Sequence, residues 1–259
     1  MRITVYALRM RAIILAAGIG QRLGTKYAGL PKCLLQFGGK SLLQRHIEIL
    51  NDLGIGRIII VTGYRYDQIE AVLERVESRA PVETIINPNY EMGSVVSLYC
   101  ACNFLTDGAD TILMDADVLY EPEVLGRLFA TRFSNCFLLD RDFEPGDEPV
   151  KLCVAGATPV EFRKIPDRDI SWDYQGESVG FFRFDAATST RLAHKTGEYL
   201  EKNRTDEPYE EAIRDLILET PHIFNFEDIT GQAWIEIDFP ADVERAAEMY
   251  ENSVLLTPD

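Results

Sequence analysis

Apolar and polar residues follow two different periods along this chain, and these periods predict alternating strands and helices. Residues 12–15 and 57–62 are short, continuous apolar runs, which are typical of strands covered on both faces. Residues 41–53 carry apolar side chains near helical spacing, with Ser41 as a candidate N-cap and Gly54 as a stop. Residues 67–76, 83–86, 95–105 and 111–114 continue as helix, strand, helix and strand. This order predicts a parallel sheet whose ligands bind at the carboxyl ends of the strands.

The second half of the chain has a different pattern. Residues 135–139, 150–154, 160–164 and 178–184 are expected to be strands separated by polar turns. Helices are expected at 185–202, 209–219 and 240–250, with a strand that ends at Ile237 before the last of them. Because no repeat or low-complexity linker interrupts this pattern, residues 1–259 are interpreted as one domain, with residues 1–9 as a short N-terminal extension.

Composition narrows the possible partners. The net charge of −16 argues against a nucleic-acid-binding surface, because such a surface needs cations to neutralise phosphates. Since no segment reaches the roughly 18 apolar residues of a membrane helix, no membrane partner is expected. The five cysteines form no CxxC pair, so reduced thiols and a cytoplasmic location are expected. A nucleotide, if bound, is therefore a small ligand held by a few local cations.

The first candidate for chemistry is the loop after residues 12–15. Gly18 and Gly20 follow the strand, and Arg22 and Lys32 come soon after. Glycines let backbone N–H groups wrap an anion, and neighbouring cations turn such a loop into a phosphate site. An ordinary turn is the alternative, because the loop has neither the P-loop pattern nor the complete dinucleotide fingerprint.

Carboxylates at two predicted strand ends are the second candidate. Asp115 and Asp117 follow the apolar run 111–114, and strand alternation sends both side chains to one side. Asp238 comes directly after the predicted strand that ends at Ile237. Such acids often cap turns, which is the structural alternative. Together they suit Mg²⁺, which prefers oxygen ligands.

The whole string Leu15-Ala16-Ala17-Gly18, Gly20, Arg22-Leu23 and Pro31-Lys32 resembles the signature loop of the nucleotidyltransferases that activate sugar phosphates and phospho-alcohols. The resemblance implies a Rossmann-like three-layer α/β/α fold with a mixed, mostly parallel central sheet. It also implies that residues 15–18 and 20 wrap a triphosphate, that Arg22 and Lys32 are catalytic cations, and that Asp117 and Asp238 hold Mg²⁺. Asp115 is expected close to the nucleotide as a supporting acid.

A second segment resembles one subgroup of that family. Asn87, Tyr90, Gly93-Ser94 and Ser97-Leu98-Tyr99 occur in the order of the bacterial CTP:phosphocholine cytidylyltransferases and their phosphonate and inositol-phosphate relatives. Residues 114–117, 177–182 and 236–238 continue the likeness. It implies that CTP is the donor and that Gly93 and Ser94 read the base. An ordinary helix cap is the alternative for this pair.

The sequence gives less information about the acceptor site than about the nucleotide and metal sites. Lys151 and Arg141 are candidate cations for the acceptor's phosphate or phosphonate, or are solvated surface charges. Tyr209 and Glu210 combine an aromatic ring with a carboxylate and suit an amine; alternatively they form a charged first helical turn. The expected reaction is Mg²⁺-dependent cytidylyl transfer to a small phosphorylated alcohol or phosphonate. A UTP- or dTTP-dependent sugar 1-phosphate enzyme, a metal-dependent glycosyltransferase and a non-catalytic nucleotide-binding protein stay open, as does a homodimer.

Overall fold

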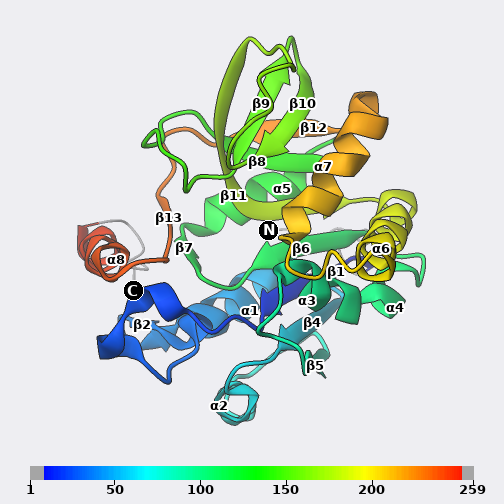
Figure 1. Ribbon diagram of the computed structural model, residues 1–259. Coiled ribbons are helices and arrows are strands. Elements are labelled where there is room, and N and C mark those ends of the chain that lie inside the picture. Colours follow the sequence, from blue (N-terminus) through cyan, green and yellow to red (C-terminus); the bar gives the residue numbers. More distant parts are fainter. Residues whose placement is uncertain (1–8, 253–259) are drawn as a thin grey trace.

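The structure is a computed structural model that describes residues 9–252, and a nine-stranded sheet runs through it (Figure 1). Nearly all of the predicted N-terminal extension, residues 1–8 of 1–9, lies outside the described residues. Along its main path the strand order is β10-β9-β11-β6-β1-β4-β5, and β8 and β12 complete the sheet through the pairs β11–β8 and β8–β12.

One half of the sheet is parallel, as the sequence predicts. The central strand β1 (Arg11–Ala16) lies between β4 (Arg57–Thr62) and β6 (Thr111–Asp115), and β5 (Val82–Ile86) forms the edge next to β4. The register pairs Leu15 with Asp115, at the carboxyl ends of β1 and β6. The glycine loop and the acidic turn therefore begin side by side.

The other half is built largely from antiparallel pairs around the long strand β11 (Tyr174–Phe184). Its partners are β6, β8 (Cys136–Asp140) and β9 (Lys151–Ala155); β10 (Thr158–Arg163) pairs with β9, and β12 (Asn225–Asp228) runs parallel to β8. Two small separate sheets join β7 (Val118–Tyr120) to β13 (Trp234–Glu236) and β2 (Gln36–Phe37) to β3 (Lys40–Ser41). The predicted mixed sheet of a Rossmann-like fold is confirmed.

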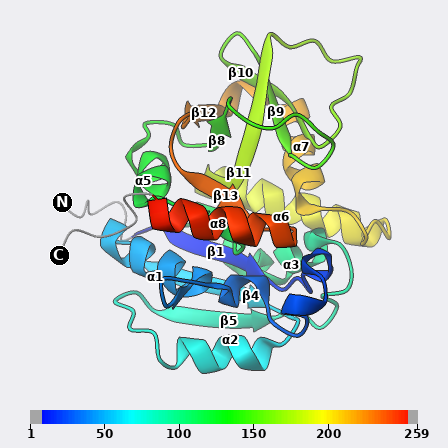
Figure 2. The ribbon, with the colours of Figure 1, turned by 90° about the vertical axis from the view of Figure 1, so that its left-hand side faces the viewer.

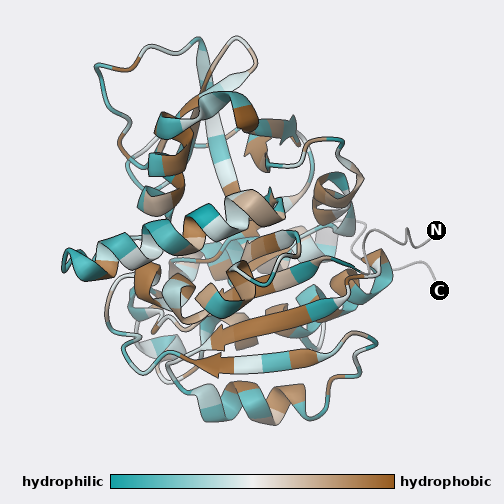
Figure 3. Cartoon of the chain, turned by 90° about the vertical axis from the view of Figure 1, so that its right-hand side faces the viewer, coloured by the Kyte–Doolittle hydropathy of each residue, from teal (hydrophilic) through white to brown (hydrophobic). Residues whose placement is uncertain are grey.

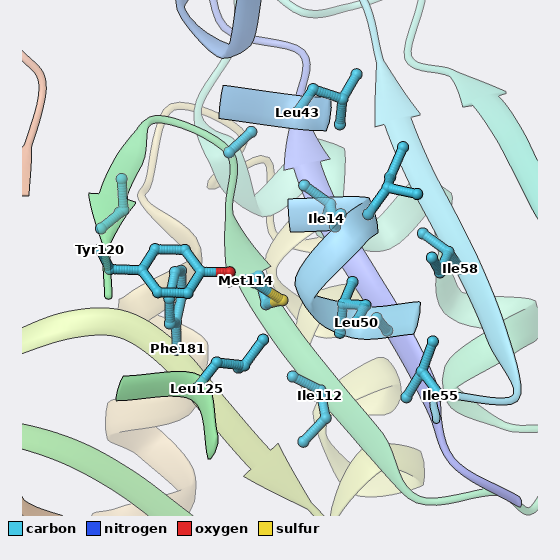
Figure 4. Close-up of a cluster of buried hydrophobic side chains, with 14 of the residues drawn as sticks. Ile14, Leu43, Leu50, Ile55, Ile58, Ile112, Met114, Tyr120, Leu125 and Phe181 are labelled. Carbon is cyan, nitrogen blue, oxygen red and sulfur yellow. The ribbon is translucent and has the colours of Figure 1, made fainter. Parts of the chain in front are cut away.

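Helices cover both faces of the parallel half, which explains its continuous apolar runs. Ile14 and Met114 pack with α1 (Leu42–Leu53) and α5 (Pro122–Ala130) in the cluster of Figure 4. Ile13 and Leu113 point to the opposite face, against α3 (Ser94–Cys100), α6 (Ala186–Glu201) and α7 (Tyr209–Glu219). Figure 3 shows the apolar strands of this half between the two helical layers.

Most predicted helices are present. The Ser41 hydroxyl accepts a hydrogen bond from the Gln44 N–H at the start of α1, and Gly54 ends that helix in the left-handed region. The last helix, α8 (Pro240–Asn252), begins at Pro240 and crosses the front of the molecule in Figure 2. Within the described range, no helix has the length and apolar character needed to cross a membrane.

The predictions fail in three ways: one helix is divided, one is shorter than expected, and several elements were missed. The helix expected at 95–105 is two helices, α3 and α4 (Cys102–Leu105), which are separated at Ala101. The helix expected at 67–76 is α2 (Tyr66–Leu73) and ends earlier. The strands β2, β3, β7 and β12 and the helix α5 were not predicted, although the apolar side chains of α5 at 124, 125 and 128 have helical spacing.

Candidate active site

The glycine loop leaves the carboxyl end of β1 and lies against Lys32. Gly20 has φ +68°, in the left-handed region that glycine adopts readily. A Cβ at Gly20 would lie 2.9 Å from Cγ of Lys32, so glycine here allows the close approach of that side chain. A Cβ at Gly18 would meet nothing within 4 Å. The loop thus fixes Lys32 on one side and leaves open space on the other.

A continuous chain of ion pairs connects this loop with both predicted metal ligands. Lys32 Nζ lies 2.9 Å from Asp117 Oδ2 and 2.5 Å from Asp238 Oδ1. Arg22 Nη2 contacts the same Asp238 oxygen at 2.8 Å, and Arg22 Nη1 contacts Glu148 at 2.7 Å. Cations from one end of the chain and carboxylates more than 80 residues away therefore meet at one place.

Lys32 is held as a charged ammonium. Burial alone would lower the pKa of Lys32, but the Asp117 and Asp238 carboxylates outweigh this effect and raise the pKa above its usual range. Its side chain is only 15% exposed, so the ammonium is largely screened from water by the acids it neutralises. Such a fixed cation is suited to neutralising charge on a phosphate.

A third carboxylate, Glu236, joins the two predicted ligands. Ligand oxygens of Asp117, Glu236 and Asp238 all lie within 4.8 Å of one another. Burial, followed by the charges of Asp117 and Asp238, raises the pKa of Glu236 to about 8. Negative charge is thus under-compensated here, and an all-oxygen set of this size fits a divalent ion such as Mg²⁺. Sequence reasoning gave Glu236 no role, although it precedes Asp238 at the same spacing that separates Asp115 from Asp117.

Asp115 lies outside this trio, in a second acidic group. The Tyr209 hydroxyl donates a 2.8 Å hydrogen bond to Asp115 Oδ2. A Cβ at Gly180 would lie 2.2 Å from the same oxygen, so only glycine leaves room for this carboxylate. Burial and the neighbouring Glu210, Asp117 and Glu236 carboxylates raise the pKa of Asp115 well above its usual range.

Glu210 is the other member of that group. Among the described residues, its buried Oε2 has no hydrogen-bond partner. Burial raises the pKa of Glu210 to about 7, while Lys164 acts in the opposite direction. Glu210 also lines a cavity of about 420 Å³. The remaining lining residues are Val150, Arg163, Lys164, Ile165, Pro208 and Glu211. The predicted pair Tyr209 and Glu210 therefore faces both the acids and a small, largely apolar space.

Gly93 and Ser94 are used differently from the sequence expectation. The Gly93 N–H donates to the Thr205 carbonyl at 2.8 Å, and the Ser94 hydroxyl accepts from the Tyr209 N–H at 2.9 Å. A Cβ at Gly93 would lie 2.2 Å from the Glu207 carbonyl oxygen. Their N–H and hydroxyl groups thus dock the segment before α7, and the expectation that they read a base stays a prediction.

Lys151 and Arg141, the predicted acceptor cations, both contact groups of the protein itself. Lys151 is 6% exposed, and its ammonium donates to the carbonyls of Gly146, Pro149 and Lys164. It therefore holds neighbouring loops together. Arg141 stacks over the Tyr174 ring with its guanidinium carbon 4.6 Å from the ring centre. Backbone carbonyls thus surround the Lys151 ammonium, whereas the Arg141 side chain stays about half exposed, and both acceptor assignments stay predictions.

Lys164 and Glu148 are further candidate site residues, which sequence reasoning missed. Lys164 Nζ lies 3.1 Å from Glu148 Oε2, the oxygen that Arg22 also contacts. Glu148 borders a second cavity of about 470 Å³ that reaches Glu236 and Asp238. Lys164 was expected only as the end of a strand, and nothing in its local sequence distinguishes it from a surface lysine.

Curated relatives match nearly the whole chain. CMP-5'-(3-aminopropyl)phosphonate synthase of Streptomyces rubellomurinus is 24% identical over 93% of the chain, and the bifunctional IPC transferase and DIPP synthase of Thermococcus kodakarensis is 30% identical over 92%. The chain spans only 38% and 50% of the lengths of these two proteins. Choline-phosphate cytidylyltransferase of Streptococcus pneumoniae is 28% identical over 94% of the chain and 99% of its own length.

The fold has a solved counterpart, and the first half of the chain has a family match. The structure of CTP:phosphocholine cytidylyltransferase from Streptococcus pneumoniae superposes with a TM-score of 0.73 at 24% identity, covering 93% of this chain and 99% of that one. Residues 12–157, more than half of the chain, match the MobA-like NTP transferase domain and include the glycine loop, Lys32 and Asp117. The chain therefore belongs to the family of MobA-like NTP transferase domains.

Proposed function

We propose that this protein is a Mg²⁺-dependent cytidylyltransferase that moves CMP from CTP to a small phosphorylated or phosphonate acceptor and releases pyrophosphate. The observation that carries this proposal is the convergence of Lys32 and Arg22 with Asp117 and Asp238 beside the glycine loop. Family membership supports nucleotidyl transfer, and the names of the phosphonate and choline-phosphate relatives support CTP and this acceptor class.

The reaction needs positioning and charge neutralisation more than proton transfer. An acceptor oxygen attacks the α-phosphorus, the bond to the β-phosphate breaks, and both electrons of that bond leave with pyrophosphate. Lys32 neutralises charge on the α-phosphate, while Arg22 and the loop at 18–20 bind the β- and γ-phosphates. Mg²⁺ would be held by Asp117, Asp238 and Glu236 and, when bound, supplies further positive charge for the phosphates.

The second acidic group supports an acceptor that carries an ammonium group. Glu210 Oε2 is buried and finds no hydrogen-bond partner within residues 9–252, and Asp115 lies close to Glu210 with a pKa well above its usual range. A cation placed there would stabilise both carboxylates. Val150, Ile165 and Pro208 line the same cavity and suit short alkyl groups, and Lys164 at its border suits the acceptor's phosphate or phosphonate.

Acceptor and donor are tested together by pyrophosphate release. The assay combines CTP, UTP, dTTP or GTP with phosphocholine, 2-aminoethylphosphonate, inositol 1-phosphate or a hexose 1-phosphate. We expect CTP with an amine acceptor to give the highest kcat/KM. Preference for UTP or dTTP with a hexose 1-phosphate would replace the proposal by the sugar nucleotidyltransferase alternative, and nucleotide binding without turnover would favour a non-catalytic protein.

Two lysine variants test the acceptor end. We expect Lys164→Met to raise the acceptor KM by about tenfold or more with little change in the KM for CTP, because a charge-assisted contact to the phosphate is lost. Lys151→Met is the matched control: it should lower stability, since the buried Lys151 ammonium bonds three backbone carbonyls, without a selective effect on the acceptor KM. The opposite pattern would restore Lys151 as the acceptor cation.

Compartment and assembly stay proposals. All five cysteines are free, which supports the reducing cytoplasm as the location. We retain a homodimer as an alternative to a monomer, to be decided by light scattering.

A further inference from the structure

His46 is a buried polar residue in the otherwise apolar stripe of α1. Its neighbours on this stripe, Leu42, Leu43, Ile47 and Leu50, are all fully buried, and so is His46 itself. An imidazole at such a position carries a desolvation cost unless both ring nitrogens are hydrogen-bonded. A leucine at position 46 would fill the same stripe without that cost. The hydrogen bonds of His46 therefore point to a role beyond core packing.

Both ring nitrogens of His46 have partners, and the partners define its tautomer. Nε2 lies 3.2 Å from the Ala116 carbonyl oxygen, and Nδ1 lies 3.1 Å from the Tyr120 hydroxyl. A carbonyl only accepts, so Nε2 carries the proton and Nδ1 accepts from the hydroxyl. Burial lowers the pKa of His46 to about 4, which keeps the ring neutral and this arrangement intact near neutral pH.

The bonded carbonyl belongs to the turn that presents the candidate metal ligand. Ala116 lies between Asp115 and Asp117, and the next carbonyl along the chain, that of Asp117, accepts from the Ile237 N–H at 3.0 Å. Two successive carbonyls of this turn are therefore held from two sides, by α1 and by the segment that carries Asp238. Because these bonds orient the peptide planes on either side of the Asp117 Cα, they set the direction of its carboxylate toward Lys32.

Aromatic packing prevents the imidazole from rotating away. The His46 ring stacks on Tyr120 at 5.4 Å and meets the edge of Phe181 at 6.1 Å, and the latter two rings are 4.8 Å apart. Figure 4 shows the Tyr120 and Phe181 rings next to each other in the core beside β6. Phe181 directly follows Gly180, the residue against which the Asp115 carboxylate lies. The same trio of rings thus connects α1, β7 and β11 behind the acidic turn.

We propose that His46 is a positioning residue for the metal-binding turn: its hydrogen bond to the Ala116 carbonyl holds Asp117 in the direction needed to share one divalent ion with Glu236 and Asp238. This inference rests on the proposed function for the identity of the metal site. It assigns a role to a side chain that touches neither substrate nor ion. Residues that orient metal ligands in this way typically change metal affinity or activity by about 10- to 100-fold when they are replaced.

Mn²⁺ binding, measured by electron paramagnetic resonance of the free ion, tests the proposal without any turnover. We expect His46→Leu to raise the Kd for Mn²⁺ by about tenfold or more, since the turn loses its donor. His46→Gln can still offer an amide N–H to the Ala116 carbonyl and should bind Mn²⁺ close to the wild-type value. In turnover assays, the Mg²⁺ concentration for half-maximal rate should rise in His46→Leu more than the KM for CTP.

A comparison of two amides removes the risk that His46→Leu does not fold. His46→Asn is too short to reach the carbonyl and should lose Mn²⁺ affinity, whereas His46→Gln keeps it. Asn51→Ala is the matched control on α1. Asn51 is the other buried polar side chain among the described residues of this helix, and its oxygen accepts from Ser78, Arg79 and Ala80, away from the site. We expect it to lower stability and leave Mn²⁺ affinity unchanged.

Equal Mn²⁺ affinity in His46→Asn and His46→Gln, or in wild type and a folded His46→Leu, would overturn the proposal. An equal loss in Asn51→Ala would overturn it as well, because the effect would then be general destabilisation. Absence of cytidylyl transfer in the wild-type protein would refute the proposed function instead, and the Mn²⁺ series would still decide the role of His46.

Discussion

Lys32 connects the glycine loop of the candidate site with the two carboxylates Asp117 and Asp238. Its stem passes beneath Gly20, and its ammonium lies between two carboxylates from distant strands. Because those carboxylates keep it charged, Lys32 can neutralise a phosphate without a change of protonation. It also keeps Asp117 and Asp238 from repelling each other while no other cation is bound.

We expect Lys32→Ala to lower turnover by about 10² or more, as the loss of preorganised charge does in other active sites. Lys26→Ala is the matched control, because Lys26 lies in the same loop with an exposed side chain that packs over the Tyr27 ring. Steady-state pyrophosphate release measures both variants, and circular dichroism confirms that they are folded. Near-normal turnover of Lys32→Ala would remove this residue from the mechanism.

His46 gives a pH dependence of stability whose sign follows from its burial. The folded protein keeps the ring neutral down to a pKa of about 4, whereas the ring of the unfolded chain accepts a proton near pH 6.5. The unfolded state therefore binds more protons within this window, and the free energy of unfolding falls as the pH decreases from 6.5 to 4. The loss attributable to His46 is about 3 kcal/mol.

Urea unfolding at pH 7, 6 and 5 measures this effect in wild type and in His46→Gln. The other titrating groups are common to both proteins, so their difference isolates the imidazole. As the pH falls, we expect the free energy of unfolding to decrease more in wild type than in His46→Gln. Parallel pH profiles would show that the folded protein protonates His46 as easily as the unfolded chain does.

At the scale of elements, the position of α7 depends on a close contact with the start of α3. Gly93 allows residues 205–207 to pass within van der Waals distance, and Ser94 binds the first N–H of α7. This contact places Tyr209 and Glu210 next to Asp115. A feature that resembles a base-reading motif in the sequence thus acts as a docking point for another helix.

Gly93→Ala should separate these elements, since its Cβ would lie 2.2 Å from a backbone oxygen that cannot rotate away. We expect a loss of about 1–3 kcal/mol in stability, as for other overpacked positions, together with a raised acceptor KM. Gly126→Ala provides the control: it lies within α5, its Cβ would meet nothing within 4 Å, and it should stabilise the helix slightly. An unchanged acceptor KM in Gly93→Ala would show that the position of α7 does not affect acceptor binding.

At the scale of the whole molecule, the candidate metal site joins the parallel half of the sheet to the C-terminal segment. Asp117 comes two residues after the end of β6. Glu236 is the last residue of β13, and Asp238 lies two residues before the start of α8. An ion that binds all three is bound by the folded chain alone, because the unfolded chain does not bring these residues together. Binding should therefore stabilise the fold by mass action.

Mg²⁺ or Mn²⁺ at about 100 times its Kd should raise the free energy of unfolding by about 2.7 kcal/mol, and chelation should remove this gain. We expect Asp238→Asn to abolish the effect. Asp52→Asn serves as the control, because Asp52 forms an exposed surface pair with Arg79 that contributes little. Chemical unfolding with and without the ion measures the gain. An equal gain in Asp238→Asn would place the ion elsewhere.

Much of this architecture could be predicted from the sequence for local reasons. The runs at 57–62 and 111–114 are continuous because both sheet faces are covered, and the helix at 209–219 has the bounds its pattern indicates. The sequence also pointed to the glycine loop, Lys32, Asp117 and Asp238, which the structure brings together, because strand ends, glycines and acids leave a short-range signature. Elements such as β7 and β12 were missed because two short strands depend on their partners more than on their own residues.

By itself, then, the sequence determined where most strands and helices form and which strand ends carry charge, since these follow from periods of two and 3.6 residues and from local residue types. Only the tertiary structure decided which charges meet. The Lys151 ammonium donates to backbone carbonyls, and Lys164 and Glu236 lie at the candidate site. Gly93 packs against the segment before α7. The physical reason is that a side chain's partners are fixed by neighbours far away in sequence, through packing and desolvation that no local pattern records.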